Sequence, residues 1–151
     1  MTSAELPEAS IPDTHAGILE TALTAMVSTI GHKDGLISTN PVAFDWDGEY
    51  IRLSTLKSRV KYRNLLANPQ ITFCALHAKD LSRYIEIRGH AEVSEDPDGS
   101  LNRELFNRIT GKDWPNLDEP GAERVIVKIV PTQVSAPALY GGRFDRPDSD
   151  S

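Results

Sequence analysis

Apolar residues between positions 14 and 26 recur at the three- and four-residue spacing of a helix. The residues that share this spacing are Ile18, Leu19, Ala22, Leu23 and Met26. Side chains spaced in this way lie along one side of a helix, so residues 14–26 predict an amphipathic helix that covers a core. Residues 1–12 show no such period, and we expect them to form a flexible tail.

Two Asp-Gly pairs, at 34–35 and 47–48, mark turns in the segment that follows. Both residue types tolerate the positive φ angles of a tight hairpin turn, and strand-like sequence flanks each pair. The stretches separated by these turns are residues 27–30, 36–46 and 50–55. We expect the three stretches to form an antiparallel meander.

Strand patterns return in the second half of the chain. Residues 70–76 form a mostly apolar run with the length of a buried strand, and residues 124–130 form another. Residues 83–93 alternate instead, with Ile85 and Ile87 on one side and charged side chains on the other. This alternation predicts a strand that has one face toward the core and one toward water.

Two short helices interrupt these later strands. The first is predicted over residues 58–67, where we expect Ser58 to cap the helix and Pro69 to end it. The second is predicted over residues 100–110. Gly111 is its expected end, because glycine adopts the left-handed conformation of a helix C-terminus at little cost.

The order of these elements predicts a mostly β protein with short helices, of the α+β class. Six strands without a regular strand–helix–strand alternation indicate a six-stranded antiparallel barrel and argue against a doubly wound parallel sheet. The length of 151 residues suits one domain. We assign residues 13–136 to the barrel and residues 1–12 and 137–151 to tails.

The composition narrows the possible functional classes. A net charge of −6 argues against a general nucleic-acid-binding protein, whose surface would be basic. No run approaches the roughly 18 apolar residues of a membrane-spanning helix, and the first residues lack the pattern of a secretion signal. We therefore expect a cytoplasmic protein. The single cysteine, Cys74, excludes an internal disulfide, and its apolar neighbours predict a small strand residue.

Positive charge is concentrated in one part of this acidic chain. Between Glu49 and Asp80, thirty consecutive positions carry no acidic residue. The basic residues among them are Arg52, Lys57, Arg59, Lys61, Arg63 and Lys79. The local charge is thus +6 in a chain whose net charge is −6, and any anion site has to be local.

Several of these cations lie at the start of the helix predicted over residues 58–67. The helix dipole is positive there, so each cation costs roughly 0.3–1 kcal/mol. A phosphate on the free N–H groups after Ser58 would offset this cost, with Arg59 and Lys61 beside it. The hydroxyls of Ser54 and Thr55 would supply further donors. The alternative interpretation is a solvated basic surface that acidic residues balance elsewhere in space.

The stretch STLKSRVKYRNLLANPQ resembles the S-T-x-x-x-R-x-K-x-R-N-L-x-x-x-P signature of a known family. This is the pyridoxamine 5′-phosphate oxidase-like family of split-barrel flavin and deazaflavin oxidoreductases. The turn at 34–35, Pro41-Val42 and the stretch FDWDGEYIRLST extend the resemblance over residues 30–73. The strands at 83–93 and 125–134 are also similar to the family's later strands. The resemblance implies an FMN-binding split β-barrel and a homodimer with cofactor sites at the subunit interface.

The resemblance also implies roles for individual residues. The positions that match the family's phosphate-binding segment are Ser54, Thr55, Arg59 and Lys61. Ser58 joins the predicted cofactor-binding residues because it lies at the start of the helix on which we expect the phosphate. The positions that match the strand beside the isoalloxazine or deazaflavin ring are Asn40, Pro41 and Val42. The residues that we expect to reach a cofactor tail or the partner's site are Lys57, Arg63 and His77.

The R-x-K-x-R-N-L form of the signature looks closest to the deazaflavin group, so the resemblance implies coenzyme F420 as cofactor. FMN is the alternative, because it carries the same ribityl phosphate. The implied reaction is hydride transfer from reduced F420 to an unsaturated organic substrate of the enone, quinone or tetrapyrrole type. The cofactor carries this chemistry, so we expect no catalytic residue. The four histidines lack metal-ligand spacing, and we expect no metal site.

Other classes of function remain open at this point. The protein would be an FMN-dependent oxidoreductase if FMN binds in place of F420. It would be a non-catalytic F420 carrier if it binds the cofactor without turnover. Heme binding, or no cofactor at all, is a further alternative. Tyr62 and Phe73 lie within and after the basic stretch as possible base-stacking groups, which motivates a single-stranded nucleic-acid interpretation.

Overall fold

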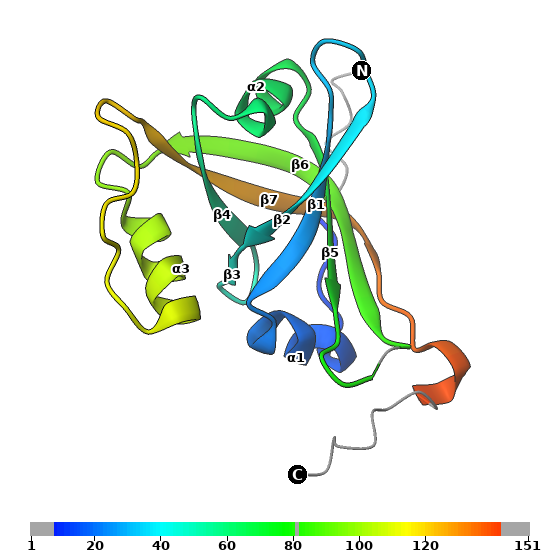
Figure 1. Ribbon diagram of the computed structural model, residues 1–151. Helices are drawn as coiled ribbons and strands as arrows, with labels where there is room; N and C mark the ends of the chain where they lie inside the picture. Colours follow the sequence, from blue (N-terminus) through cyan, green and yellow to red (C-terminus); the bar gives the residue numbers. More distant parts are fainter. Residues whose placement is uncertain (1–7, 81, 143–151) are drawn as a thin grey trace.

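The strands of the protein form one curled antiparallel sheet in the computed structural model, which describes residues 8–80 and 82–142 (Figure 1). The elements in chain order are α1 (Asp13–Thr21), β1 (Thr24–Ile30), β2 (Ile37–Ala43), β3 (Asp45–Trp46), β4 (Ile51–Leu56), α2 (Val60–Ala67), β5 (Gln70–Leu76), β6 (Tyr84–Glu95), α3 (Ser100–Thr110), β7 (Arg124–Ser135) and the 3-10 turn η1 (Leu139–Gly142). The mostly β class with short helices and the split-barrel type are confirmed.

The sheet has seven strands in the order β2-β1-β5-β6-β7-β4-β3, rather than the six that the sequence predicts. The extra strand arises because residues 36–46 do not form one strand. They form β2 and β3, which lie at opposite edges of the sheet and are separated only by the fully buried Phe44. The chain therefore passes from one edge to the other at Phe44, and the expected three-strand meander is instead two separate hairpins.

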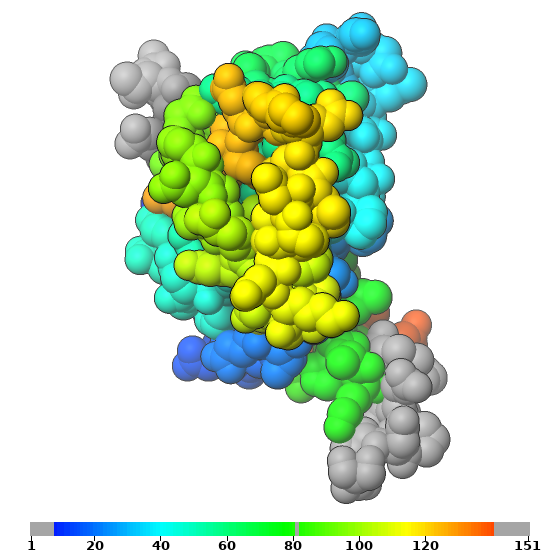
Figure 2. Space-filling model, turned by 60° about the vertical axis from the view of Figure 1, so that its left-hand side comes forward, coloured from blue at the N-terminus to red at the C-terminus, as the bar shows by residue number. Residues whose placement is uncertain are grey.

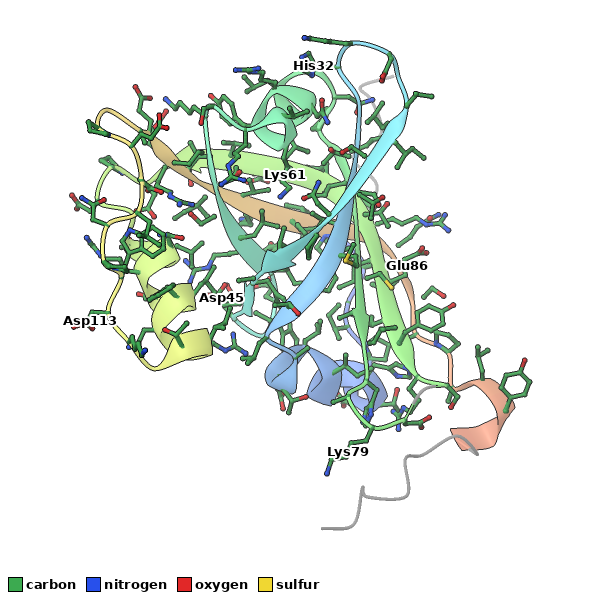
Figure 3. All side chains as sticks on the ribbon, in the orientation of Figure 1. His32, Asp45, Lys61, Lys79, Glu86 and Asp113 are labelled. Carbon is green, nitrogen blue, oxygen red and sulfur yellow. The ribbon has the colours of Figure 1, made fainter. Side chains whose placement is uncertain are left out.

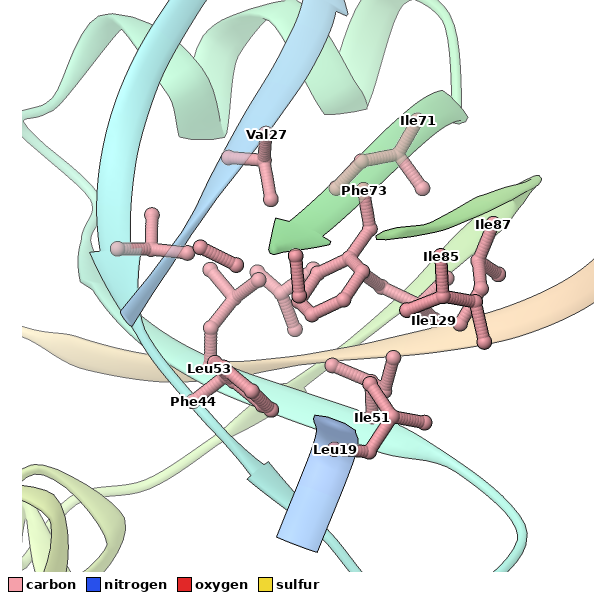
Figure 4. Close-up of a cluster of buried hydrophobic side chains, with 14 of the residues drawn as sticks. Leu19, Val27, Phe44, Ile51, Leu53, Ile71, Phe73, Ile85, Ile87 and Ile129 are labelled. Atoms are coloured by element: carbon pink, nitrogen blue, oxygen red, sulfur yellow. The ribbon is translucent and has the colours of Figure 1, made fainter. Parts of the chain in front are cut away.

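The core lies inside the curl of the sheet (Figure 4). Phe44 meets Phe73 edge to face there, with ring centroids 4.9 Å apart. The aliphatic side chains that surround these rings include Leu19, Val27, Ile51, Leu53, Ile71, Ile85, Ile87 and Ile129. All of them are almost completely buried, as the alternating pattern of residues 83–93 predicts for Ile85 and Ile87.

The first helix is shorter than its apolar spacing predicts. It ends at Thr21, and β1 begins at Thr24, so Leu23 and Met26 are not helical. Met26 pairs with Pro41 of β2 on one side and with Cys74 of β5 on the other. Two neighbouring strands satisfy the backbone there, and this tertiary pairing overrides a helical pattern that the local sequence supports equally well.

The two other helices differ in how well their ends were predicted. The second begins at Val60, its N-cap residue is Arg59, and no side chain caps it, so the expected cap at Ser58 is wrong. A turn held by the Arg59 N–H donating to the Leu56 carbonyl precedes the helix instead. The third spans residues 100–110 as predicted, and Gly111 ends it with φ of 71°.

The segments outside the barrel are only partly described. Residues 1–7 and 143–151, which belong to the expected tails, lie outside the described residues. In the described part, the Ala9 N–H donates to the Pro131 carbonyl, and Ile11 packs against the core. Cys74 lies in β5 as expected, where burial raises the pKa of its thiol. No helix within the described ranges is long and apolar enough to cross a membrane.

Candidate functional site

A groove of about 270 Å³ opens where the curled sheet fails to close, between β2, β4 and α3. The predicted site residues that line it are Pro41, Val42, Ser54, Thr55, Arg59 and Lys61. They come from β2, from β4 and from the turn into α2 with its first residues. The structure thus brings together two segments that the sequence analysis singled out separately.

Two strand edges face each other across this groove. The second strand pairs with β1 on one side only, because it is an end strand of the sheet. On the side opposite β7, β4 pairs with β3 through Ile51 and Arg52, and none of the described strands pairs there with the positions from Ser54 to Leu56. Peptide groups on unpaired edges remain available to a ligand.

The position of α2 over the groove is fixed by the fully buried Asn64. Its Nδ2 donates to Thr29 Oγ1 at 3.0 Å, and its Oδ1 accepts from the His32 N–H at 2.9 Å. The side chain therefore ties the helix both to β1 and to the turn after it. Satisfied buried amides of this kind hold neighbouring elements in one arrangement.

Arg59 and Lys61 lie side by side at the groove. Neither forms an ion pair with any residue in the described ranges 8–80 and 82–142. Burial, and then the nearby positive charge of Arg59, lower the pKa of Lys61 below its ordinary value. A half-buried cation beside a second cation is unfavourable in the absence of an anion, and such perturbed groups are concentrated at functional sites.

The hydroxyls of Ser54 and Thr55 share the groove with these cations. Thr55 is buried and Ser54 is half-buried. The groove is lined on another side by Leu105, Phe106 and Ile109 of α3. One part of the groove is therefore cationic and rich in donors, and another part is apolar. This division suits a ligand with an anionic end and a planar or apolar end.

Sequence reasoning did not identify the groove residues that come from α3 and β7. The helix itself was predicted, but its Asn102 and Phe106 were given no role. Arg124, the first residue of β7, also lines the groove, because the pairing of β4 with β7 places it opposite Leu56. Only this long-range register brings Arg124 to the site, and no local motif signals it.

Three of the predicted residues lie close to the groove but do not line it. Asn40 is half-buried in β2, one position before Pro41. Ser58 is exposed in the turn before α2. The ammonium of Lys57 is held between Glu95 and Glu123, at 2.7 Å from each carboxylate.

The remaining two predicted residues do not line the groove either. Arg63 is exposed on α2. The strand β5 ends near α1 and away from the groove-side helix α2 (Figure 1), and His77 directly follows this end. Its Nδ1 accepts hydrogen bonds from the N–H groups of Lys79 and Asp80, which fixes the turn between β5 and β6. Within the described residues, no group of three or more potential ligands could hold a metal ion.

Known proteins resemble the chain over most of its length. A family model for pyridoxamine 5′-phosphate oxidase matches residues 11–136. A solved structure of an F420 reductase is 32% identical, with a TM-score of 0.74, and the match covers 83% of this chain and 98% of that one. No curated protein matches the chain.

Two further solved structures share the fold at lower identity. A conserved hypothetical protein from Mycobacterium tuberculosis is 22% identical, with a TM-score of 0.69 over 90% of this chain and 88% of that one. General Stress Protein 26 from Bacillus anthracis is 19% identical, with a TM-score of 0.60 over 80% and 88% of the two chains. At these identities the likeness supports the fold alone.

Proposed function

The chain belongs to the pyridoxamine 5′-phosphate oxidase family, and on that premise we propose that it is an oxidoreductase that uses coenzyme F420. Reduced F420 would deliver a hydride to an unsaturated organic substrate of the enone, quinone or tetrapyrrole type. The proposal rests on the groove geometry, on the family membership and on the 32% identity to an F420 reductase.

The observation that carries the proposal is the position of two cations, Arg59 and Lys61, beside the hydroxyls of Ser54 and Thr55. Neither cation forms an ion pair within the described part of the chain. The phosphate of FMN is a monoester with about −1.5 to −2 charges near pH 7 and three strong acceptor oxygens. In F420 the same phosphate also bears the lactyl-glutamyl tail, so it is a diester with a single negative charge. Either form would pair with the cations and accept hydrogen bonds from both hydroxyls. The residues present therefore fit the ribityl phosphate that F420 and FMN share.

The rest of the groove suits the ring of such a cofactor. The edge of β2 at Pro41 and Val42 forms one wall, and Phe106 and Ile109 of α3 contribute an apolar surface. When bound, the cofactor supplies the hydride-transfer chemistry, and the protein supplies binding and orientation. The backbone of Asn40, Pro41 and Val42 would lie along the ring. We assign no catalytic role to any side chain.

F420 differs from FMN in its anionic lactyl-glutamyl tail, so residues near the phosphate site decide the preference. Arg63 is exposed on α2 and forms no ion pair within the described ranges, which suits contact with such a tail. Lys57 suits this role less well, because Glu95 and Glu123 already neutralise it. Ser58 lies in the turn before α2, and its backbone N–H would donate to the phosphate.

We also propose that the protein is a homodimer whose interface lies on the outer face of β1, β2 and β5. The outward positions, identified by their alternation with buried ones, are Thr24, Met26, Ser28, Ile30, Ile37, Thr39, Pro41, Ala43, Gln70, Thr72, Cys74 and Leu76. None of these residues is charged, and depletion of charge is typical of interface cores. Pro41 and Ala43 also line the groove, so the cofactor would lie beside the interface.

The dimer proposal predicts a strong effect of a charge at Met26, which is 43% exposed in this face. Met26→Lys is expected to raise the dimer dissociation constant about ten-fold or more, because the ammonium loses its hydration in the interface. Sedimentation velocity over a concentration series measures this constant. Leu117→Lys, on an exposed loop away from the face, is the matched control. A monomeric wild type, or equal constants for Met26→Lys and wild type, would overturn the assignment.

The function is tested first by fluorescence titration of the purified protein with F420 and, separately, with FMN at matched salt. Preferential binding of F420, followed by its oxidation in the presence of an enone, quinone or tetrapyrrole, would support the proposal. Preference for FMN would place the protein among flavin-dependent enzymes. Tight F420 binding without turnover across the panel would indicate a carrier, and binding of neither cofactor would refute the proposal.

The lowered pKa of Lys61 predicts how affinity depends on pH. A bound phosphate stabilises the ammonium, so the pKa of Lys61 is higher in the complex than in the free protein. Affinity is therefore greatest below the free-protein pKa, which lies under 10.5, and falls as pH rises from that value toward the pKa of the complex. The Lys61→Arg variant should lack this alkaline decline, because arginine stays charged. Titrations of both proteins between pH 7 and about 11 test this. An equal decline of cofactor affinity at alkaline pH in the two proteins would contradict it.

A further inference from the structure

Arg124 lies between the groove and the loop that joins α3 to β7. Its guanidinium forms a two-point ion pair with Asp118, with Nε to Oδ2 at 2.8 Å and Nη2 to Oδ1 at 2.7 Å. The two side chains are only 13% and 17% exposed. A two-point pair with so little exposure holds the guanidinium in one orientation.

An aromatic pair holds the same guanidinium from another side. The Arg124 Cζ lies 5.7 Å from the centre of the Trp114 ring. Trp114 in turn meets Phe106 edge to face, with ring centroids 5.1 Å apart. Phe106 lines the groove, so Trp114 links the position of Arg124 to the groove's apolar wall. Figure 2 shows the loop that carries Trp114 and Asp118, in yellow, along this surface beside α3.

The remaining nitrogen of the guanidinium points to the candidate phosphate site. Arg124 Nη1 donates to Ser54 Oγ at 3.4 Å. A donor on the oxygen of a hydroxyl occupies one of its lone pairs, and the hydroxyl hydrogen is then free to turn toward a different acceptor. In this groove the Ser54 hydroxyl would then be able to donate its hydrogen to an anion beside Arg59 and Lys61.

The charges at this end of the groove also favour a bound anion. Arg59, Lys61 and Arg124 are three cations, and Asp118 is one carboxylate. The hydrogen bond from Arg124 lowers the pKa of Asp118, and Arg59 contributes a smaller electrostatic effect in the same direction. Asp118 is therefore ionised, and the local sum is +2. A positive sum complements the ribityl phosphate, whether it is the monoester of FMN, with about −1.5 to −2 charges, or the diester of F420, with a single negative charge.

We propose that Arg124 is a positioning residue of the phosphate site: it orients the Ser54 hydroxyl toward the phosphate and supplies a third positive charge. Asp118 and Trp114 hold it in that orientation. This inference rests on the proposed function, and it extends the site beyond the basic segment of the sequence to β7 and the loop before it.

The test is a double-mutant cycle on binding of the cofactor that wild type prefers, F420 or FMN, measured by fluorescence titration. Arg124→Gln is expected to raise the dissociation constant three- to ten-fold. Ser54→Ala is expected to act similarly, and the double variant should bind only slightly more weakly than either single variant. The dependence of the dissociation constant on salt should also be shallower in Arg124→Gln, because the site loses one charge. Arg103→Gln, at an exposed position of α3, is the matched control.

Two further variants separate positioning from folding. Arg124→Lys keeps the charge but loses the two-point geometry, so it should restore the salt dependence but not the coupling to Ser54. Asp118→Asn should weaken binding although it removes a negative charge from the site, because it releases the guanidinium. Both variants also test the inference if Arg124→Gln does not fold.

The outcomes distinguish this inference from the proposed function. If Lys61→Ala weakens cofactor binding but Arg124→Gln binds as wild type does, the proposed function stands and the role of Arg124 is refuted. If the effects of Arg124→Gln and Ser54→Ala simply add, Arg124 does not act through Ser54. If wild type binds neither F420 nor FMN, both proposals fail together.

Discussion

Replacing Lys61 with alanine is expected to raise the dissociation constant of the phosphate-bearing cofactor about 10- to 150-fold, a loss of about 1.5–3 kcal/mol. The half-buried ammonium lacks a carboxylate partner among the described residues, so its favourable electrostatic interaction arises only when the phosphate binds. Arg59→Ala should have a similar effect. Fluorescence titration with F420 and FMN at fixed salt and pH measures both variants.

Two controls make this result specific. Lys79→Ala removes the same charge from an exposed position at the opposite end of the barrel, so it should leave the affinity nearly unchanged (Figure 3). The thermal stability of the ligand-free Lys61→Ala variant should equal or exceed that of wild type, because the folded protein disfavours the charged form of Lys61. An unchanged dissociation constant for Lys61→Ala would refute the assignment of Lys61 to the phosphate site.

Replacing Gly89 with alanine is expected to lower the free energy of unfolding by about 3 kcal/mol or more, for a steric reason. The strands β6 and β7 shift register between Arg88 and Gly89, and this irregularity brings the two backbones unusually close. A Cβ on Gly89 would lie 1.9 Å from the carbonyl oxygen of Val130 and 2.9 Å from its carbonyl carbon. Backbone atoms cannot rotate away as a flexible side chain would, so the strands have to separate locally.

Urea denaturation monitored by circular dichroism measures this change, and Gly17→Ala is the matched control. Apart from its chain neighbours and the backbone of its own helix, no atom lies within 4 Å of a Cβ built on Gly17, which is in α1. The same substitution should therefore stabilise the protein by roughly 0.5–1 kcal/mol, because alanine is the better helix former. Similar destabilisation by the two substitutions would show that the close approach at Gly89 does not govern its effect.

The sequence by itself determined the features that depend on local physics. Gly35 and Gly48 adopt φ of 73° and 98°, as the two Asp-Gly turns predict. The helix at 100–110 and its end at Gly111 follow from spacing and from the conformational freedom of glycine. The grouping of Arg59 and Lys61 with Ser54 was also readable, because these residues lie within eight positions of one another. Each signal arises between near neighbours in the chain.

Only the tertiary structure decided the features that depend on distant partners. The start of β1 at Thr24 was not predictable, because pairing with β2 and β5 outweighs a helical pattern that the local sequence allows equally well. The break at Phe44 was not predictable either, because it reflects closure of the sheet between its two edges. Lys57 belonged to the same basic run as Lys61, yet its partners Glu95 and Glu123 come from β6 and the loop before β7.

The composition of the groove shows the same division. The sequence identified the basic segment of the site, whose residues are close together in the chain. The apolar wall from α3 and the guanidinium of Arg124 reach the groove through the packing of α3 and the register of β4 with β7. Register and packing are decided by the summed burial and hydrogen bonding of whole strands, and these sums leave no signature at any single position.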